Sequence, residues 1–322
     1  MPNAQPNAAS KPMIGEFQVN QPVDSVFLLA KCVLRSARTG KPYLDLEFSD
    51  RTGRITGRFW DATESLAASL AIDDFVQVKG RVESYQGQLQ VNVHMVAKAD
   101  TAKLRLGDFL PQSEHDPAQM MRRLTEILGG IEDPDYRRLA QAFLADETFC
   151  AAFRTAPAAT SNHHAYLGGL LEHTLSMAEL ALKVLEHYRD LRRDILLLGV
   201  LLHDIGKTRE LAYKRTFQYT DAGNLVGHIT LGVLMLEEEA RKLPDFPAEK
   251  LNMLRHMILS HHGVLEYGSP KLPMFAEAMA LHYLDNLDAK LRDIAETISE
   301  DRNADPQWTD YSRSLGRKLY KG

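Results

Sequence analysis

The sequence of 322 residues contains little cysteine: only Cys32 and Cys150, each among apolar neighbours. A disulfide framework is therefore not expected, and the cytoplasm is the expected compartment. The chain also lacks an apolar run of the ~20 residues that a membrane helix needs, so no membrane interaction is expected. Its first residues do not combine a positive region with an apolar core, as a secretory signal would. Residues 1–13 are instead expected to form a disordered tail.

A basic surplus is absent as well, since the formal net charge is −5. Residues 1–110 carry 13 Lys and Arg against 12 Asp and Glu, and the remainder carries 25 against 31. Proteins that bind nucleic acid mainly through phosphate contacts usually have a basic surplus. Any nucleic-acid binding by this chain must therefore come from local patches and from stacking on aromatic side chains.

The N-terminal part has the period of β-strands. Apolar and polar residues alternate over 44–48, 55–59 and 89–95, which indicates strands with one buried face. Turn sequences at 39–42, 50–53 and 86–87 separate the runs, and a short helical stretch at 64–71 falls between the third and fourth strands. This order resembles that of an oligonucleotide-binding (OB) barrel. We therefore expect a nucleic-acid-binding OB domain over residues 14–100, followed by a linker over residues 101–116.

From residue 117 the period becomes that of helices. Apolar stripes run through 120–128 and 171–185, residues 195–202 are nearly all apolar, and 274–299 should form a last long helix. Between 211 and 227 the pattern is interrupted. We expect a hairpin or ordered loop there, which contains Phe217, Tyr219 and a turn at 221–224. The predicted fold class is thus two domains, an all-β barrel and then an all-α bundle over residues 117–322.

Histidine and aspartate recur along the helical part, where ten of the 12 histidines lie between positions 163 and 282. Imidazole and carboxylate ligands suit manganese, iron, cobalt, nickel or zinc, and a large mixed set can hold two ions. Two ions close together are a device for attacking phosphorus esters. A lone buried histidine is usually a satisfied core residue, but this concentration favours a metal site. The candidate ligands are His173, His203, Asp204, His228, His261, His262 and Asp285.

The order of these residues resembles the H…HD…D signature of HD-domain phosphohydrolases, which His173, His203-Asp204 and Asp285 carry here. The run from His203 to Lys207 matches the usual HDxGK form. Together with an N-terminal OB barrel, the HD domain is similar to the YhaM-type 3′–5′ exoribonucleases. The resemblance implies a helical HD bundle and two divalent metal ions, with manganese expected and iron, cobalt, nickel and magnesium as alternatives.

The resemblance also implies roles for the ligands. His203, Asp204 and Asp285 would be the inner ligands, and Asp204 would bridge the ions because a carboxylate has two oxygens. His173 would complete the coordination of one ion. The second would be held by the additional ligands of the two-metal subset: His228, His261 and His262. If only the four signature residues bind, one ion remains, and the extra histidines position substrate.

Several neighbours of the ligands are candidates for supporting roles. Lys207 is expected to act in catalysis by binding a phosphoryl oxygen as a point charge. His163 and His164 are candidates to contact phosphate or to cap a helix. Asp288 is expected to hydrogen-bond to a ligand histidine.

Aromatic residues of the barrel are candidates for guiding a single strand. Arg58 and Trp60 share the wet face of one strand and Tyr43 that of its neighbour, which suits stacking of bases. Phe217 and Tyr219 could grip a terminal base.

Three functions remain open at this point. The first is a metal-dependent 3′–5′ exonuclease acting on single-stranded RNA, with DNA as a further substrate. The second is an HD-type phosphohydrolase acting on a small nucleotide or cyclic nucleotide, which gains little from a barrel. The third is a binding module with a structural HD site, which the intact ligand set and Lys207 disfavour. Assembly into a homo-oligomer is expected from the resemblance alone.

Overall fold

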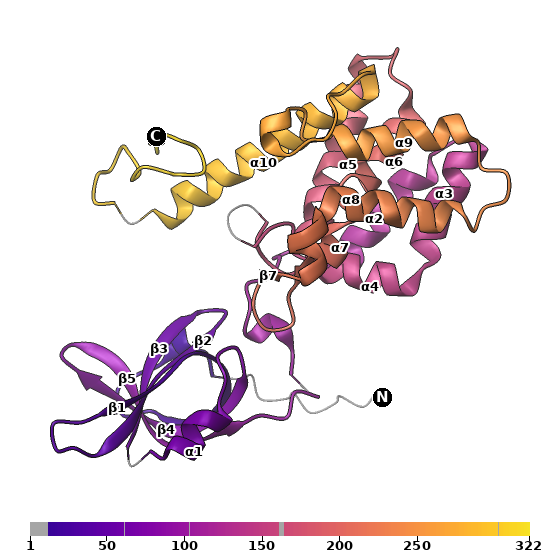
Figure 1. Ribbon diagram of the computed structural model, residues 1–322. Helices are drawn as coiled ribbons and strands as arrows, with labels where there is room; N and C mark the ends of the chain where they lie inside the picture. Colours follow the sequence, from indigo (N-terminus) through magenta and orange to yellow (C-terminus); the bar gives the residue numbers. More distant parts are fainter. Residues whose placement is uncertain (1–11, 61, 103, 161–163, 302) are drawn as a thin grey trace, which may run out of the picture. The chain divides into compact units, whose positions relative to one another are not determined.

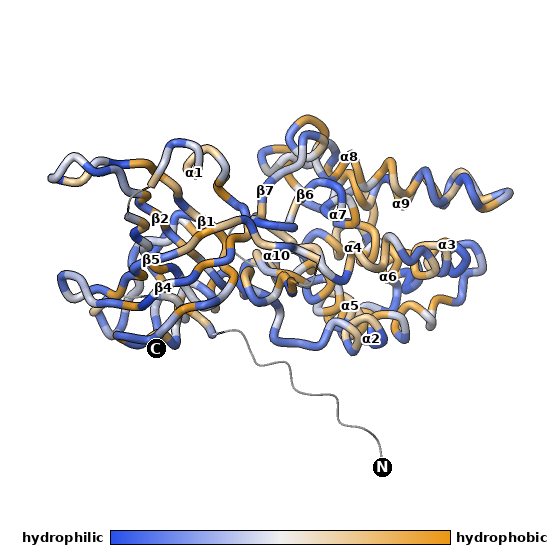
Figure 2. Tube along the Cα trace, turned by 90° about the horizontal axis from the view of Figure 1, so that it is seen from below, coloured by the Kyte–Doolittle hydropathy of each residue, from blue (hydrophilic) through white to orange (hydrophobic). Residues whose placement is uncertain are grey.

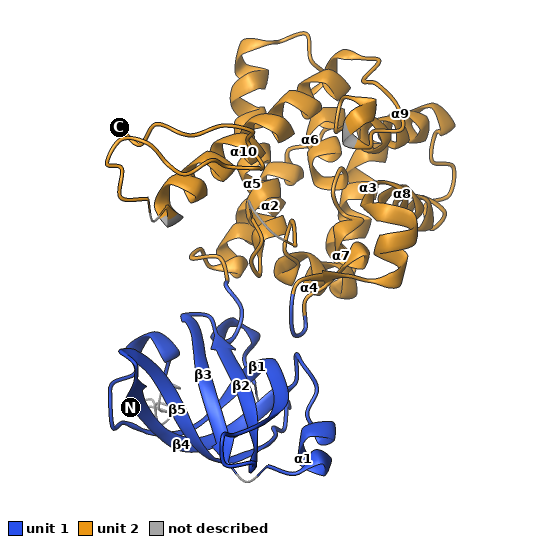
Figure 3. Ribbon diagram, turned by 60° about the vertical axis from the view of Figure 1, so that its left-hand side comes forward, with its two compact units in different colours: residues 1–111, 214–216 blue, residues 112–213, 217–322 orange. Residues whose placement is uncertain are grey.

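The computed structural model describes residues 12–60, 62–102, 104–160, 164–301 and 303–322. Most of the expected N-terminal tail, residues 1–11, lies outside this range. The chain divides into two compact units, one of residues 1–111 with 214–216 and one of residues 112–213 with 217–322 (Figure 3). Each unit has its own hydrophobic core. None of the described helices has the length and apolar character needed to cross a membrane.

The first unit is a closed barrel with strand order β1-β2-β3-β5-β4 (Figure 1). Neighbouring strands are antiparallel except for the parallel pair β3–β5, and helix α1 lies between β3 and β4 in the chain. The expected OB-type barrel is thus confirmed. Its elements are η1 (Ile14–Glu16), β1 (Pro22–Ser36), β2 (Pro42–Asp50), β3 (Gly53–Trp60), α1 (Glu64–Ser69), β4 (Phe75–Tyr85), β5 (Gln88–Lys98) and η2 (Leu106–Asp108).

Alternation along the strands fills the barrel. Leu44, Leu46 and Phe48 of β2 are fully buried, as the period of two requires. The pairing of β2 with β3 sets Tyr43 opposite Trp60. Figure 2 shows hydrophilic and hydrophobic residues alternating along the chain in both units. The barrel therefore presents Tyr43 and Trp60 side by side on its outer surface.

The second unit is a bundle of helices around α6, in which every residue from Ile195 to Leu202 is buried. This confirms the predicted all-α second part. Its elements are α2 (Pro117–Gly129), α3 (Pro134–Ala145), α4 (Glu147–Thr155), α5 (Gly169–His187), α6 (Arg193–Leu202), α7 (Lys207–Glu210), β6 (Leu211–Ala212), β7 (Gln218–Tyr219), α8 (Asp221–Ala240), α9 (Ala248–Ser260), η3 (Leu265–Tyr267) and α10 (Ala276–Glu300).

The interruption after α7 is a small hairpin, as expected, but the predicted turn at 221–224 is wrong. Strands β6 and β7 pair through Leu211 and Tyr219. Residues 221–224 form the first turn of α8, which Thr220 caps by accepting a hydrogen bond from the backbone N–H of Gly223. Small polar residues suit a capped first turn as well as an open turn. The helix contains a kink at Gly227, whose φ of 78° is left-handed.

Gly206 lets the turn after α6 pack directly on α8. A Cβ at this position would collide with the backbone carbonyl of His228 and would lie 2.6 Å from the backbone nitrogen of Gly232. Both obstacles are backbone atoms, which cannot rotate away. The glycine of the HDxGK run is therefore a packing requirement that fixes the distance between His203-Asp204 and α8.

Substitution of Gly206 by alanine should lower the melting temperature of the helical unit, because α8 must shift; overpacking typically costs about 1–3 kcal/mol. Differential scanning calorimetry measures the effect. The matched control is Gly129→Ala, since a Cβ on Gly129 meets nothing within 4 Å and should leave the transition unchanged or slightly raised. Equal melting temperatures for Gly206→Ala and the wild type would contradict this account.

Candidate metal centre

Five segments of the helical unit bring the candidate ligands to one place. Helix α5 carries one ligand, the end of α6 two, α8 one, the end of α9 two and α10 one. The contacts described below link all of them: His173, His203, Asp204, His228, His261, His262 and Asp285.

One group of donors surrounds His173 and His203. The Nε2 atoms of these two histidines are 3.3 Å apart. Asp285 Oδ1 lies 3.3 Å from Nε2 of His173, and Asp204 Oδ2 lies 3.3 Å from Nε2 of His203. All four residues are largely or fully buried. This first ligand group therefore consists of two imidazole nitrogens and two carboxylate oxygens.

A second group surrounds the other oxygen of Asp204. Its Oδ1 lies 3.6 Å from Nε2 of His228 and 3.6 Å from Nε2 of His261. His262 joins His228 and His261 in a set whose ligand atoms lie within 4.8 Å of one another. The carboxylate of Asp204 thus has one oxygen in each group, which is the arrangement of a bridging ligand.

Three buried atoms of the second group lack a hydrogen-bond partner among the described residues: Asp204 Oδ1, His228 Nε2 and His261 Nε2. An unsatisfied buried polar atom costs about 1–3 kcal/mol, so three that converge call for a common partner. Donors bound to one ion at about 2.0–2.2 Å are about 3.0–3.5 Å apart in octahedral or tetrahedral geometry. The observed separations are close to these values, so the residues fit divalent cations.

The Nδ1 atoms of the candidate histidine ligands are held by hydrogen bonds to neighbouring acceptors. In His203 and in His261, Nδ1 donates to the backbone carbonyl three residues earlier, at Val200 and Ile258, with a distance of 2.8 Å in both cases. Such bonds set the tautomer and leave Nε2 with a lone pair that is available to a metal ion.

Carboxylates perform the same task for two other ligands. Asp288 Oδ2 accepts from Nδ1 of His173 at 2.7 Å, which confirms the hydrogen bond expected for Asp288. Glu210 Oε1 accepts from Nδ1 of His228 at 3.1 Å and from its backbone N–H at 2.9 Å. Glu210 was not among the expected site residues, because nothing in its local pattern at the end of the short helix α7 distinguishes it.

His164 does not cap a helix, which was one of the two roles considered for it. It is buried, with Nδ1 2.9 Å from the hydroxyl of Tyr166 and Nε2 3.4 Å from Asp288. Ser176 also donates to Asp288. His164 and Ser176 therefore help to hold the carboxylate that orients His173. His163 lies outside the described residues.

The pKa shifts in the cluster favour protonation states that suit metal binding. Burial works to raise the pKa of Asp204, but Lys207 and His203 outweigh it and hold this pKa well below its usual value. Burial and the neighbouring His262 hold the pKa of His261 well below its usual value. Burial opposes the charged form of His173 too, yet hydrogen bonds to Asp285 and Asp288 raise its pKa to about 9. Asp204 is thus ionised, and a cation would compete with the proton on His173.

Lys207 lies at the start of α7 with its Nζ 2.6 Å from Asp204 Oδ2. The ammonium group has three donors, so this contact leaves others for a second acceptor. Lys207 also lines a pocket of about 240 Å³ whose walls include three of the candidate ligands. The lining residues are Asp204, Lys207, His262, His282, Asp285, Asn286, Ala289 and Lys290.

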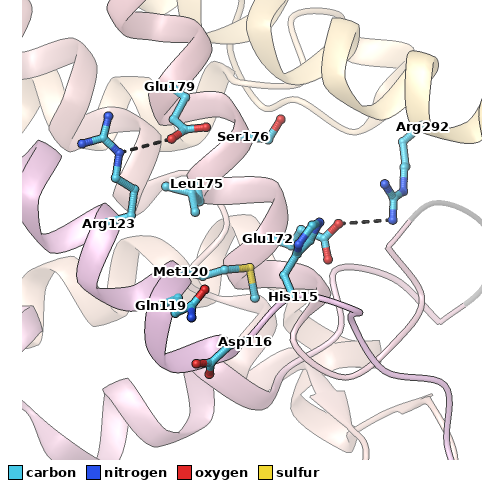
Figure 4. Close-up of a pocket in the computed structure, with 10 residues that line it drawn as sticks. All are labelled: His115, Asp116, Gln119, Met120, Arg123, Glu172, Leu175, Ser176, Glu179 and Arg292. Atoms are coloured by element: carbon cyan, nitrogen blue, oxygen red, sulfur yellow. Dashed lines mark hydrogen bonds and ion pairs between the residues drawn. The ribbon is translucent and has the colours of Figure 1, made fainter.

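A larger pocket of about 470 Å³ is lined by residues of α2, of the segment just before it, of α5 and of α10 (Figure 4). Its two arginines already have carboxylate partners: Arg123 pairs with Glu179 at 3.2 Å, and Arg292 pairs with Glu172 at 3.2 Å. The smaller pocket is therefore the better candidate for a substrate site, because it reaches the candidate metal ligands.

The barrel residues form a separate group on the outer surface of β2 and β3. The rings of Tyr43 and Trp60 are 5.0 Å apart, and Arg58 lies 5.8 Å from the centre of the Tyr43 ring. Trp60 is 48% exposed, so part of its ring is accessible for stacking. Arg58 is also paired with the buried Asp45, as are Lys31 and Arg35. Its charge is therefore partly neutralised.

The two aromatic residues of the hairpin belong to the helical unit. Tyr219 is the last residue of β7 and is 50% exposed. Phe217, which precedes the strand, is half-buried. The barrel group and the hairpin residues each lie outside the ligand cluster.

Comparison with known families and proteins agrees with this geometry. A family model described as an HD domain matches residues 170–290, and one described as an OB-fold nucleic acid binding domain matches residues 30–98. A third model, whose description reads "Putative helicase", matches residues 111–189.

Among curated relatives, the 3′–5′ exoribonuclease YhaM of Bacillus velezensis is 38% identical over 85% of this chain and 87% of its own. The YhaM of a Geobacillus species is 37% identical over 89% of this chain and 88% of its own. The YhaM of Bacillus subtilis is 37% identical over 85% of this chain and 87% of its own.

The substitution Asp204→Asn should reduce the metal content of the purified protein, because an amide has no charge and only one oxygen to donate. We expect a fall from close to two ions per chain to one or none, measured by elemental analysis of protein purified without chelator. Circular dichroism should be nearly unchanged. The control is Asp190→Asn on the exposed turn after α5, which should keep both ions. Two ions in Asp204→Asn would show that this carboxylate is no bridge.

Proposed function

Because the chain belongs to the YhaM family of 3′–5′ exoribonucleases, we propose that its cluster holds two divalent ions and hydrolyses single-stranded RNA from the 3′ end. The observation that carries the two-ion proposal is the convergence of three buried, unpaired atoms around Asp204 Oδ1. Manganese is the proposed metal, and iron, cobalt, nickel and magnesium are the alternatives. Imidazole-rich sets with carboxylates suit such ions.

The residues of the cluster would have different roles in binding the two ions and the substrate. His173, His203 and Asp285 would hold one ion, His228, His261 and His262 the other, and Asp204 both. Divalent ions supply activation of water and neutralisation of charge on a phosphate. Lys207 would place a positive charge beside the phosphoryl oxygens while it keeps Asp204 oriented. Asp288 and Glu210 hold His173 and His228 in position, so the donor atoms are preorganised.

The barrel would guide the strand. Tyr43, Trp60 and Arg58 offer stacking and a cation, and sequence-tolerant binding of single strands uses such surfaces. Phe217 and Tyr219 would contact a terminal base. Residues 14–100 would be the binding domain, residues 101–116 the linker, and residues 117–322 the hydrolase domain. A cytoplasmic location, assembly into homo-oligomers and action on single-stranded DNA belong to the same proposal.

The proposal predicts stepwise shortening of RNA. Purified protein with manganese should convert a 5′-labelled single-stranded RNA into a ladder that shortens from the 3′ end and releases nucleoside monophosphates. A 3′-labelled strand should lose its label in the first step. Absence of any shortening, together with hydrolysis of mononucleotides or cyclic nucleotides, would instead support a small-molecule phosphohydrolase.

The substitution Trp60→Ala should weaken action on long single strands by about 1–3 kcal/mol in kcat/KM, the value of one base–aromatic contact. It should barely change hydrolysis of a minimal activated phosphodiester, which reaches only the metal centre. Tyr85→Ala is the control, because Tyr85 is an exposed aromatic residue at the end of β4. Equal losses on both substrates would mean that Trp60 supports the fold.

A further inference from the structure

A row of polar side chains leads away from the metal ligands along α10. His282, Asn286 and Lys290 follow at intervals of four residues, so they lie on one face of the helix, each about one turn from the next. All three line the pocket that also contains Asp204 and Asp285. The row therefore begins beside the metal centre and continues to the rim of its pocket.

Lys290 differs from the other cations near the site. It is exposed, and among the residues that the structure describes it has no hydrogen bond or ion pair. Lys207 is bound to Asp204 at 2.6 Å. Arg292, on the same helix, contacts Glu172, Glu296 and the hydroxyl of Tyr166. Lys290 thus contributes a positive charge to the pocket that no described carboxylate neutralises.

The near end of the row is anchored to the ligand loop. His282 donates through Nδ1 to the backbone carbonyl of His261 at 2.9 Å. Gly263 makes room for this ring, because a Cβ there would collide with the imidazole, and its φ of 78° is left-handed. The row is therefore held at a fixed distance from the second ligand group.

The spacing of the row suits a nucleic-acid strand. Lys290 is five residues beyond the ligand Asp285, which is about 7.5 Å along the axis of an α-helix. Neighbouring phosphates of an extended strand are separated by a distance of that order. In 3′–5′ cleavage, the terminal nucleotide carries only the phosphate under attack. The next phosphate belongs to the strand that remains, on the 5′ side.

We propose that Lys290, beside Asn286, binds the phosphate immediately 5′ of the scissile one and so holds the strand in register. The proposal rests on the exoribonuclease function proposed above. A lysine ammonium is a flexible point charge that does not read base identity. The contact would therefore favour every strand equally and would position the substrate rather than select a sequence.

The test uses two dinucleotides that differ in one phosphate. A dinucleoside monophosphate has only the scissile phosphate, and its 5′-phosphorylated form has the next one as well. The wild type should cleave the phosphorylated form with a kcat/KM about ten-fold higher, the low end of the range for a hydrogen bond to a charged group. In Lys290→Ala this preference should fall to nearly one, and Lys290→Arg should restore most of it.

Controls separate this contact from general effects. Lys183→Ala removes an exposed lysine of α5 that pairs with Glu186 and should keep the ten-fold preference. Metal content should be equal in all variants. A preference that persists in Lys290→Ala, or that is absent from the wild type while both dinucleotides are cleaved, would overturn the proposal. Failure of the wild type to cleave any RNA would instead overturn the proposed function.

Discussion

The carboxylate of Asp204 lies between two groups of histidines, and much of the helical unit serves to keep it there. Its Oδ2 faces His203 and Lys207, and its Oδ1 faces His228 and His261. A buried carboxylate without partners would be strongly unfavourable. The apolar helix α6 delivers it to the centre of the unit, and Gly206 then allows α8 to approach. Packing of the fold thus offsets the unfavourable burial of the Asp204 carboxylate, whose negative charge can attract cations.

Orientation of the histidine rings depends on two kinds of acceptor. Backbone carbonyls fix His203 and His261 at the ends of helices, where the residue three positions earlier is always within reach. Carboxylates fix His173, which lies within α5, and His228, which follows the kink at Gly227 in α8.

The sequence grouped residues that converge in the structure and predicted one of their supports, Asp288, but it did not indicate the other, Glu210. The candidate ligands follow a specific order and share one chemistry, so no three-dimensional information was needed to group them. Glu210 contacts His228 across a hairpin and a helix start, a juxtaposition that no local pattern reveals. The error at residues 221–224 has a similar origin: Asp, Gly and Asn favour turns, and only the cap by Thr220 shows that a helix begins there.

The exposure of Lys290 has a consequence for movement along a strand. After each cut, the phosphate that the lysine has held becomes the next one to be attacked, so it must leave the lysine and travel to the metal centre. A buried, fully paired arginine would hold too firmly for such a transfer. An exposed ammonium on a flexible stem releases easily, and the five-residue spacing along α10 from Asp285 to Lys290 sets the length of one step.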